Sequence, residues 1–324
     1  MEQMNTSERH DRGVRGIIKW LARMLLDCVV IGAVWCLSLV LLSMIPGCGK
    51  ISDAVGSVWM GRSILVGNGV LVGVDDGKRT HIVFLTARHV ATCNGFFRWP
   101  SIDNAVYLRF RGSAFKHSRI ANIAPERWFC TDEALDLAWF ELTEEELAQI
   151  AGEGKMPSYV ALDAGKAGDG IVAEYDENRI YSLSKNDRVD VAKTACYPGF
   201  ETGISLSMFP LMRWSLIFTA TESAPIDAMW QRENVEAPDN ICLSRLDVSQ
   251  NVILMRAHES NSGSPIFVSG VKKDALPNLV GILVSKNDAK GIGGFQSVHT
   301  AVRAIRESVL EKKGLRLSNE KRFW

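Results

Sequence analysis

The stretch Ser260-Asn261-Ser262-Gly263-Ser264-Pro265 lies between two apolar runs, Val252–Met255 and Ile266–Val268. Small residues surround the hydroxyl group of Ser262. A serine attacks a carbonyl group only if the substrate backbone comes into van der Waals contact and backbone N–H groups face the developing oxyanion. Bulky neighbours would prevent both, so the hexapeptide suits a nucleophile. The same composition also suits an ordinary hairpin turn, and residues upstream have to decide between the two interpretations.

A serine nucleophile needs a base, and the base needs a group that orients it. His89 follows the apolar run Ile82–Leu85, and Asp136 lies inside the apolar segment 134–140. A carboxylate in such a segment is costly unless it is paired or hydrogen-bonded, and we expect His89 to be its partner. Taken singly, His89 also fits a strand end without chemistry, and Asp136 fits a turn or a bulge. Together with Ser262 they indicate a catalytic triad.

Three segments in this order resemble the motifs of the chymotrypsin-like serine proteases, especially the bacterial branch with glutamyl-endopeptidase and trypsin-like members. They are Thr86-Ala87-Arg88-His89, Asp136-Leu137-Ala138 and Asn261–Pro265. The resemblance covers residues 55–312. It implies that His89 is the general base, Asp136 its orienting group and Ser262 the nucleophile. It also implies a mostly β fold of two six-stranded antiparallel β-barrels with a C-terminal α-helix.

The same resemblance assigns an oxyanion hole and a specificity pocket. The oxyanion would be bound by the backbone N–H groups of Ser260 and Ser262. Ser260 stands where the family usually has glycine, which is a departure because glycine permits peptide orientations that a side chain resists. The possible pocket residues are grouped just before the nucleophile and on the following strand, and they are His258, Val284, Ser285 and Lys286. Lys286 and His258 would favour an acidic substrate side chain, unless they are solvated surface residues.

Asn261 marks another departure from the family. Many members have an aspartate at this place, which pairs with a newly cut N-terminus. An asparagine offers no such ion pair, so we expect no activating cleavage near residues 55–58.

The N-terminal 54 residues predict a membrane anchor. Residues 24–45 are apolar with Asp27 as their only charge, and about 20 such residues span a bilayer as a helix. Residues 1–23 are basic, whereas the other flank offers few cations, so the positive-inside rule places the N-terminus in the cytoplasm. Residues 46–54 form a linker. Alternatively, Ile45–Cys48 resembles a bacterial lipobox, in which Cys48 would carry the lipid.

Residues 55–312 predict many short strands, with one barrel over about 55–145 and a second over about 160–312. Thr143 is the expected N-cap of a short helix that continues to residue 150. Residues 222–240 have few apolar positions and are expected to form an insertion loop. Residues 297–312 show helical spacing of their apolar positions, which are Val298, Val302, Ile305, Val309 and Leu310, and residues 313–324 form a tail. The turn signal Gly67-Asn68-Gly69 is expected to separate two strands, and Gly67–Val70 also resembles the strand that precedes the histidine in the protease family.

These observations together predict a membrane-tethered serine endopeptidase outside the cytoplasm, in a bacterial periplasm or at the cell exterior. Its partners would be a protein or peptide substrate and the membrane. The 324-residue chain balances 37 basic against 37 acidic residues, so no nucleic-acid partner is expected. No cofactor and no metal site are expected either, because the cysteines lack metal-binding spacing. The alternative is an inactive protease homologue that binds peptides or proteins.

Overall fold

The computed structural model divides into two compact units, residues 1–47 and 48–324, which are described separately. The described residues are 23–30, 50–60, 64–92, 106–110, 118–120, 123–132, 135–165, 168–181, 187–196, 217–225, 229–231, 251–254, 261–269, 275–287 and 292–317.

In the first unit, residues 23–30 form a helix whose side chains are exposed. Among the described residues no helix combines the length and the apolarity needed to cross a membrane. The remainder of the predicted span 24–45 lies outside the described residues, and so does Cys48. Both N-terminal interpretations therefore stay predictions.

The second unit is mostly β. Its N-terminal half contains η1 (Lys50–Ala54), β1 (Val55–Met60), β2 (Ile64–Asp75), β3 (Thr80–Ala87), α2 (Arg88–Thr92), β4 (Val106–Phe110), β5 (Ser118–Ile120), η2 (Pro125–Arg127), β6 (Phe129–Cys130), β7 (Leu137–Glu141) and α3 (Glu144–Ala151). Antiparallel pairings join these strands in the spatial order β6, β7, β3, β2, β1, β4, β5.

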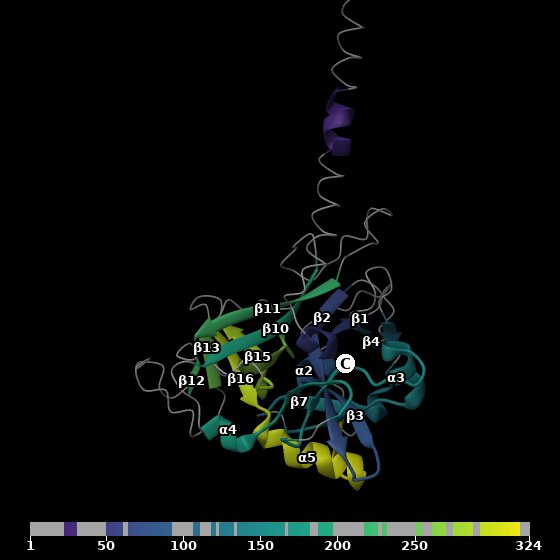
Figure 1. Ribbon diagram of the computed structural model, residues 1–324, viewed down its shortest axis with the longest axis vertical. Coiled ribbons are helices and arrows are strands. Elements are labelled where there is room, and N and C mark those ends of the chain that lie inside the picture. The colour runs from purple at the N-terminus through teal and green to yellow at the C-terminus, as the bar shows by residue number, and fades with distance from the viewer. Residues whose placement is uncertain are drawn as a thin grey trace, which may run out of the picture. The chain divides into compact units, whose positions relative to one another are not determined.

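The C-terminal half repeats this design. It contains β10 (Arg188–Cys196), β11 (Ile217–Pro225), β12 (Met229–Gln231), β13 (Asn251–Leu254), β14 (Pro265–Ser269), β15 (Asn278–Asn287), β16 (Ile292–Ser297), α5 (His299–Leu310) and β17 (Leu315–Arg316). The antiparallel order is β11, β10, β14, β15, β16, β13, β12. β17 returns to β6 of the first half. In Figure 1, the strands β10 to β13, β15 and β16 lie on one side of this unit, β1 to β4 and β7 lie on the other, and α5 runs along its edge.

Two short strands connect the halves, and they differ from the expected purely antiparallel arrangement. β8 (Tyr159–Ala161) pairs in parallel with β2 and with β9 (Ile171–Glu174), and β9 pairs in parallel with β15. The helix α4 (Glu177–Tyr181) follows. The pairings of the described residues leave each half as an open series of strands, so the predicted count of two six-stranded barrels is not confirmed.

Aromatic side chains fill the core of the first half because alternating strand positions point inward. Phe84 packs against Phe110 and Phe140 at centroid distances of 5.8 and 6.0 Å, and Trp128 packs against Phe140 at 4.6 Å. These aromatic contacts hold the strands of the first half together around one apolar core.

The expected C-terminal helix is present as α5. It buries Ala301, Val302, Ile305, Ser308 and Val309, which are one face of a helix. Ser308 accepts a hydrogen bond from Trp139 Nε1 of β7 at 2.7 Å. This bond fixes α5 against the strand that begins one residue after Asp136.

The prediction of a turn at Gly67-Asn68-Gly69 was wrong, because β2 continues through all three residues. A Cβ atom on Gly67 would lie 2.5 Å from Ser262 O, and one on Gly69 would lie 2.3 Å from Phe84 Cζ. The glycines therefore serve close backbone approach within a strand rather than chain reversal.

Candidate active site

His89 and Asp136 are brought together by the pairing of β3 with β7. His89 lies in α2, directly after β3, and Asp136 directly precedes β7. His89 Nδ1 lies 2.6 Å from Asp136 Oδ2, and the His89 backbone N–H donates to Oδ1 at 3.0 Å. The backbone N–H of Arg88 also donates to Asp136 O, at 2.8 Å. Three contacts therefore fix the imidazole relative to the carboxylate.

The carboxylate of Asp136 is held by a constrained loop. Asp136 has φ = +50°, a left-handed conformation that costs a non-glycine residue about 1–2 kcal/mol. The buried Thr131 stabilises this loop, because its Oγ1 accepts from Leu137 N at 3.0 Å and its N–H donates to Leu137 O at 2.9 Å. Strained backbone of this kind is typical of functional sites.

Ser262 lies in a tight turn that packs against β2 of the other half. The turn closes through a hydrogen bond from Ser264 N to Asn261 O at 3.0 Å, and Gly263 N donates to Leu283 O at 2.7 Å. Ser262 O accepts from Asn68 N at 2.7 Å. The Ser262 side chain belongs to a partly exposed residue, as substrate access requires.

The turn also adjoins the helix that carries His89. A Cβ atom on Gly67 would lie 2.5 Å from Ser262 O and 2.7 Å from a methyl group of Val90. Gly67 is thus the point at which the residue after His89 and the carbonyl of Ser262 meet the same strand. Of the three predicted catalytic residues, His89 and Asp136 are in direct contact, and Ser262 adjoins the helix of His89 through Gly67. Among the described residues no hydrogen bond joins the side chains of Ser262 and His89.

One of the two expected oxyanion donors falls within the described residues. Among these residues the backbone N–H of Ser262 has no acceptor, whereas those of Gly263 and Ser264 are both used. An unused N–H beside the nucleophile is what an oxyanion hole requires. Ser260, the second expected donor, lies outside the described residues.

The predicted specificity residues are only partly described. Val284 is buried, with 6% of its surface exposed. Ser285 and Lys286 follow it on β15, and their side chains are not described. His258 lies outside the described residues. Their role in a pocket stays a prediction.

A charged cluster lies at the start of β3 and the end of β7, which are the strand ends away from His89 and Asp136. His81 contacts Glu141 Oε1 through Nδ1 at 2.7 Å and Asp76 Oδ2 through Nε2 at 3.0 Å, and Lys312 donates to Glu141 Oε2 at 2.6 Å. Burial raises the pKa of Glu141, but hydrogen bonds from Lys312 and His81 outweigh it, so the pKa lies below the ordinary 4.5. The backbone N–H of Arg79 is the largest cause of the lowered pKa of Asp76.

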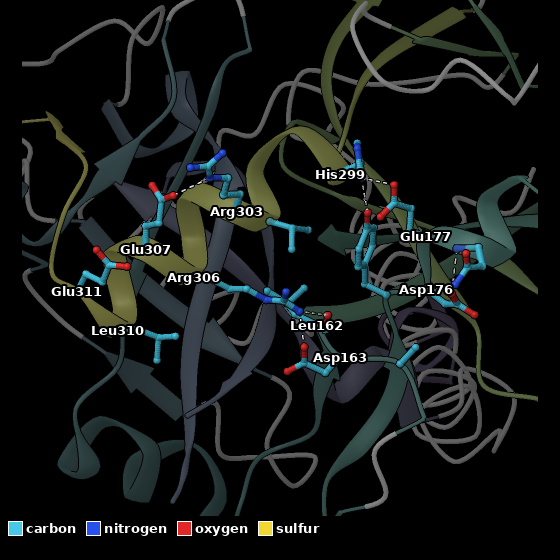
Figure 2. A pocket seen from close by; sticks show the side chains of 14 residues that line it. Leu162, Asp163, Asp176, Glu177, His299, Arg303, Arg306, Glu307, Leu310 and Glu311 are labelled. Carbon is cyan, nitrogen blue, oxygen red and sulfur yellow. Dashed lines mark hydrogen bonds and ion pairs between the residues drawn. The ribbon is translucent and has the colours of Figure 1, made fainter. Parts of the chain in front are cut away.

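A cavity of about 540 Å³ lies away from these residues, between α5 and the segments that follow β8 and β9. Figure 2 shows its charged lining, with Arg306 beside Asp163 and Arg303 beside Glu307. None of the predicted catalytic or pocket residues lines this cavity. It is therefore not the expected substrate-binding cleft.

No protein-family model matches the chain. No curated protein matches it either. Among solved structures it resembles a catalytically inactive tobacco etch virus protease with substrate, at 12% identity and a TM-score of 0.42, covering 83% of this chain and 90% of that one. It also resembles the serine protease domain of the Sesbania mosaic virus polyprotein, at 12% identity and a TM-score of 0.41, covering 78% of this chain and 91% of that one. A third similar structure is the HtrA-type protease AlgW with a decapeptide, at 12% identity and a TM-score of 0.42, covering 82% of this chain and 66% of that one. At such identities and scores, nothing about the chemistry of this chain follows.

Sequence reasoning missed Asn68 and Thr86 as neighbours of the turn formed by residues 261–264, called the serine turn below. Both side chains are fully buried. The available signal was Gly67-Asn68-Gly69, a polar residue between two glycines in an apolar context. Turns have the same composition, so the signal that identifies a strand here is the resemblance of Gly67–Val70 to the strand before the histidine in the protease family.

Proposed function

We propose that the chain is a serine endopeptidase in which His89 is the general base, Asp136 its orienting carboxylate and Ser262 the nucleophile. The contact of 2.6 Å between His89 Nδ1 and Asp136 Oδ2 is the observation that carries the proposal. It occupies one ring nitrogen of a partly exposed imidazole and leaves Nε2 for proton transfer.

The reaction would follow two stages. Ser262 Oγ attacks the scissile carbonyl carbon while its proton passes to His89 Nε2. The C–N bond then breaks, and the same proton passes to the departing amine, which leaves an acyl ester on Ser262. Water attacks this ester with His89 as base, and the proton returns to Ser262 Oγ as the acid product leaves. Asp136 stabilises the imidazolium in both stages.

The oxyanion of each tetrahedral intermediate would face the backbone N–H groups of Ser262 and Ser260. Losing one such donor typically costs about 10²–10³ in rate. The side chain of Ser260 is the sequence feature that favours a second candidate, an inactive homologue that binds peptides without cleaving them.

For specificity we propose the segment around His258 together with Val284, Ser285 and Lys286 on β15. A cationic lining from His258 and Lys286 would select acidic substrate side chains, as in the glutamyl-endopeptidase branch. Profiling the cleavage of a peptide library tests this assignment: enrichment of Glu or Asp before the cut supports it, and enrichment of aromatic or basic residues contradicts it.

We further propose that residues 24–45 anchor the protease in a membrane, with the N-terminus in the cytoplasm and residues after 45 outside. The apolar span and its basic N-terminal flank support this topology. Lipidation of Cys48 is the alternative anchor. Metabolic labelling with a radioactive fatty acid distinguishes them, because only a lipoprotein would incorporate label that Cys48→Ser abolishes.

The proposed activity is tested by labelling the full chain with a fluorophosphonate probe, which reacts with activated serines. Ser262→Ala and His89→Ala should abolish labelling. Ser269→Ala is the control for Ser262→Ala, because Ser269 ends the strand that follows the turn and its Oγ donates to Asp190 Oδ2 at 2.6 Å. His299→Gln is the control for His89 and alters a histidine bonded to Tyr175.

Labelling that both active-site substitutions abolish, and both controls retain, would support an activated serine. Folded wild-type chain without labelling would contradict the catalytic proposal. Binding of peptides by such an unlabelled chain would then favour the inactive homologue.

A further inference from the structure

Asn68 contacts the serine turn more extensively than a packing residue requires. Its side chain is completely buried in β2. Its backbone N–H donates to Ser262 O at 2.7 Å, and its Nδ2 donates to Ser264 Oγ at 3.0 Å. Its carbonyl oxygen accepts from Thr86 Oγ1 at 2.5 Å. The two bonds to the turn therefore reach Ser262 and Ser264, the residues on either side of Gly263.

The turn does not provide this support itself. Asn261, 3% exposed, directly precedes the nucleophile, but its buried Nδ2 has no acceptor within the described part of the chain. A buried donor without an acceptor destabilises its own local structure. The side chain that does stabilise the turn is therefore an asparagine 196 residues before Ser264.

Asn68 also relates the turn to the strand that carries the proposed base. Thr86 lies on β3, three residues before His89, and its neighbour across the β2–β3 ladder is Gly69. A route of hydrogen bonds thus runs from Ser262 through Asn68 to Thr86, and the chain continues to His89. Asn68 and Thr86 are fully buried, so water cannot replace the hydrogen bonds of Asn68. A displacement of Asn68 would therefore move Ser262 relative to His89.

We propose that Asn68 is a positioning residue that holds Ser262 in reach of His89 and keeps the Ser262 N–H directed at the oxyanion. The inference rests on the proposed serine-protease activity. Asn68 touches no substrate atom in this account, and its side-chain amide acts through Ser264 on the turn. Its loss should slow the covalent step and leave probe binding unchanged.

Asn278 is a matched control. It is likewise a completely buried asparagine that joins two segments, because its Oδ1 accepts from Asp176 N at 2.7 Å and its Nδ2 donates to Asp176 O at 3.1 Å. It has no contact with the serine turn among these bonds. Asn278→Ala therefore reports the general cost of removing such a side chain.

The test measures fluorophosphonate inactivation of the full chain at several probe concentrations, which separates the maximal rate of serine modification from probe affinity. Asn68→Ala should lower the maximal rate about 10- to 100-fold, since a misplacement of about 1 Å has effects of this size, with unchanged apparent affinity. Asn278→Ala should keep the wild-type rate. Denaturant midpoints, recorded in parallel, should fall for both variants.

Ser264→Ala provides a second approach that does not depend on how well Asn68→Ala folds. It should also lower the maximal rate, and the double variant Asn68→Ala/Ser264→Ala should be no slower than the slower single variant, because both remove one interaction. Additive losses would overturn the inference.

The inference also fails if wild-type chain is labelled and folded Asn68→Ala reacts at the wild-type rate, or if Asn278→Ala slows equally. In these cases the proposed protease activity stands. Only a folded wild-type chain that is not labelled would instead refute the activity itself.

Discussion

Replacing Gly263 by alanine should disable the serine turn, and Gly77 offers a close control. Both glycines have φ = +83°, so alanine suffers the same left-handed backbone strain of about 1–2 kcal/mol at either place. They differ in their surroundings. A Cβ atom at position 263 would lie 1.8 Å from Asn68 O and 2.4 Å from Thr86 Oγ1, whereas nothing lies within 4 Å at position 77.

The clash sets the magnitude. Cβ contacts below 3.0 Å essentially never occur, so Gly263→Ala must move its Cβ and Asn68 O apart by about 1.2 Å, from 1.8 Å to 3.0 Å. Asn68 O cannot move aside as a flexible side-chain end, because it belongs to the backbone of β2. A displacement of this size should slow serine modification at least about 100-fold, which corresponds to about 2.7 kcal/mol in activation free energy.

The assay compares fluorophosphonate labelling rates of the folded fractions of wild type, Gly263→Ala and Gly77→Ala, with urea midpoints measured in parallel. Gly77→Ala should lose stability but keep the wild-type labelling rate. If Gly263→Ala labels within a few-fold of Gly77→Ala, the turn is not held against Asn68 and the reasoning about the site is wrong.

Three further predictions concern stability and processing. Burial raises the pKa of Glu141, but hydrogen bonds from Lys312 and His81 lower it further, so the folded-state pKa lies below 4.5. The Glu141 carboxylate therefore stabilises the fold above about pH 4.5, and this stability is lost as the pH falls through the folded-state pKa. Unfolding midpoints of Glu141→Gln should depend less on pH in this range than those of wild type, and an unchanged dependence would contradict the assignment. Ser308→Ala leaves the buried Nε1–H of Trp139 without its acceptor and should cost about 1–3 kcal/mol in chemical unfolding, with Ser308→Thr less harmful than Ser308→Ala if the hydroxyl is what matters. Cleavage before Val55 should not raise probe labelling, since β1 is already buried and paired with two strands; an inert full chain that gains activity on cutting would refute this.

The parts predicted correctly from the sequence are those governed by local physics. Thr143 caps α3 as expected: its Oγ1 accepts from Glu146 N, and the Glu146 carboxylate accepts from Thr143 N in return. The apolar spacing that predicted a helix over 297–312 appears as α5, although Leu310, expected on its apolar face, is 48% exposed. Capping and periodicity involve residues a few positions apart, so the sequence contains the whole interaction.

The parts predicted wrongly depend on partners far away in the chain. Gly67-Asn68-Gly69 has the composition of a turn, but it lies in a strand because Ser262 packs against it. Strand formation at residues 222–225 and 229–231, in a region expected to be an insertion loop, depends on pairing with β10 and β13. The parallel pairing of β8 with β2 is equally nonlocal. No local pattern specifies which distant backbone will be available.

The proposed site shows the same division between local and distant information. The proposed roles of His89, Asp136 and Ser262 can be predicted from the sequence because the three residues occur together, in one order, although each alone also fits an ordinary structural role. Their relative placement depends on other residues. Asn68 donates a hydrogen bond to Ser264 Oγ in the serine turn, and Thr131 Oγ1 accepts one from Leu137 N, directly after Asp136. A substitution at these supporting positions leaves every catalytic group present. It should therefore lower the rate of serine modification although the three sequence motifs stay intact. Variants at Asn68 and Thr131 thus test the geometry of the site separately from the presence of its catalytic groups.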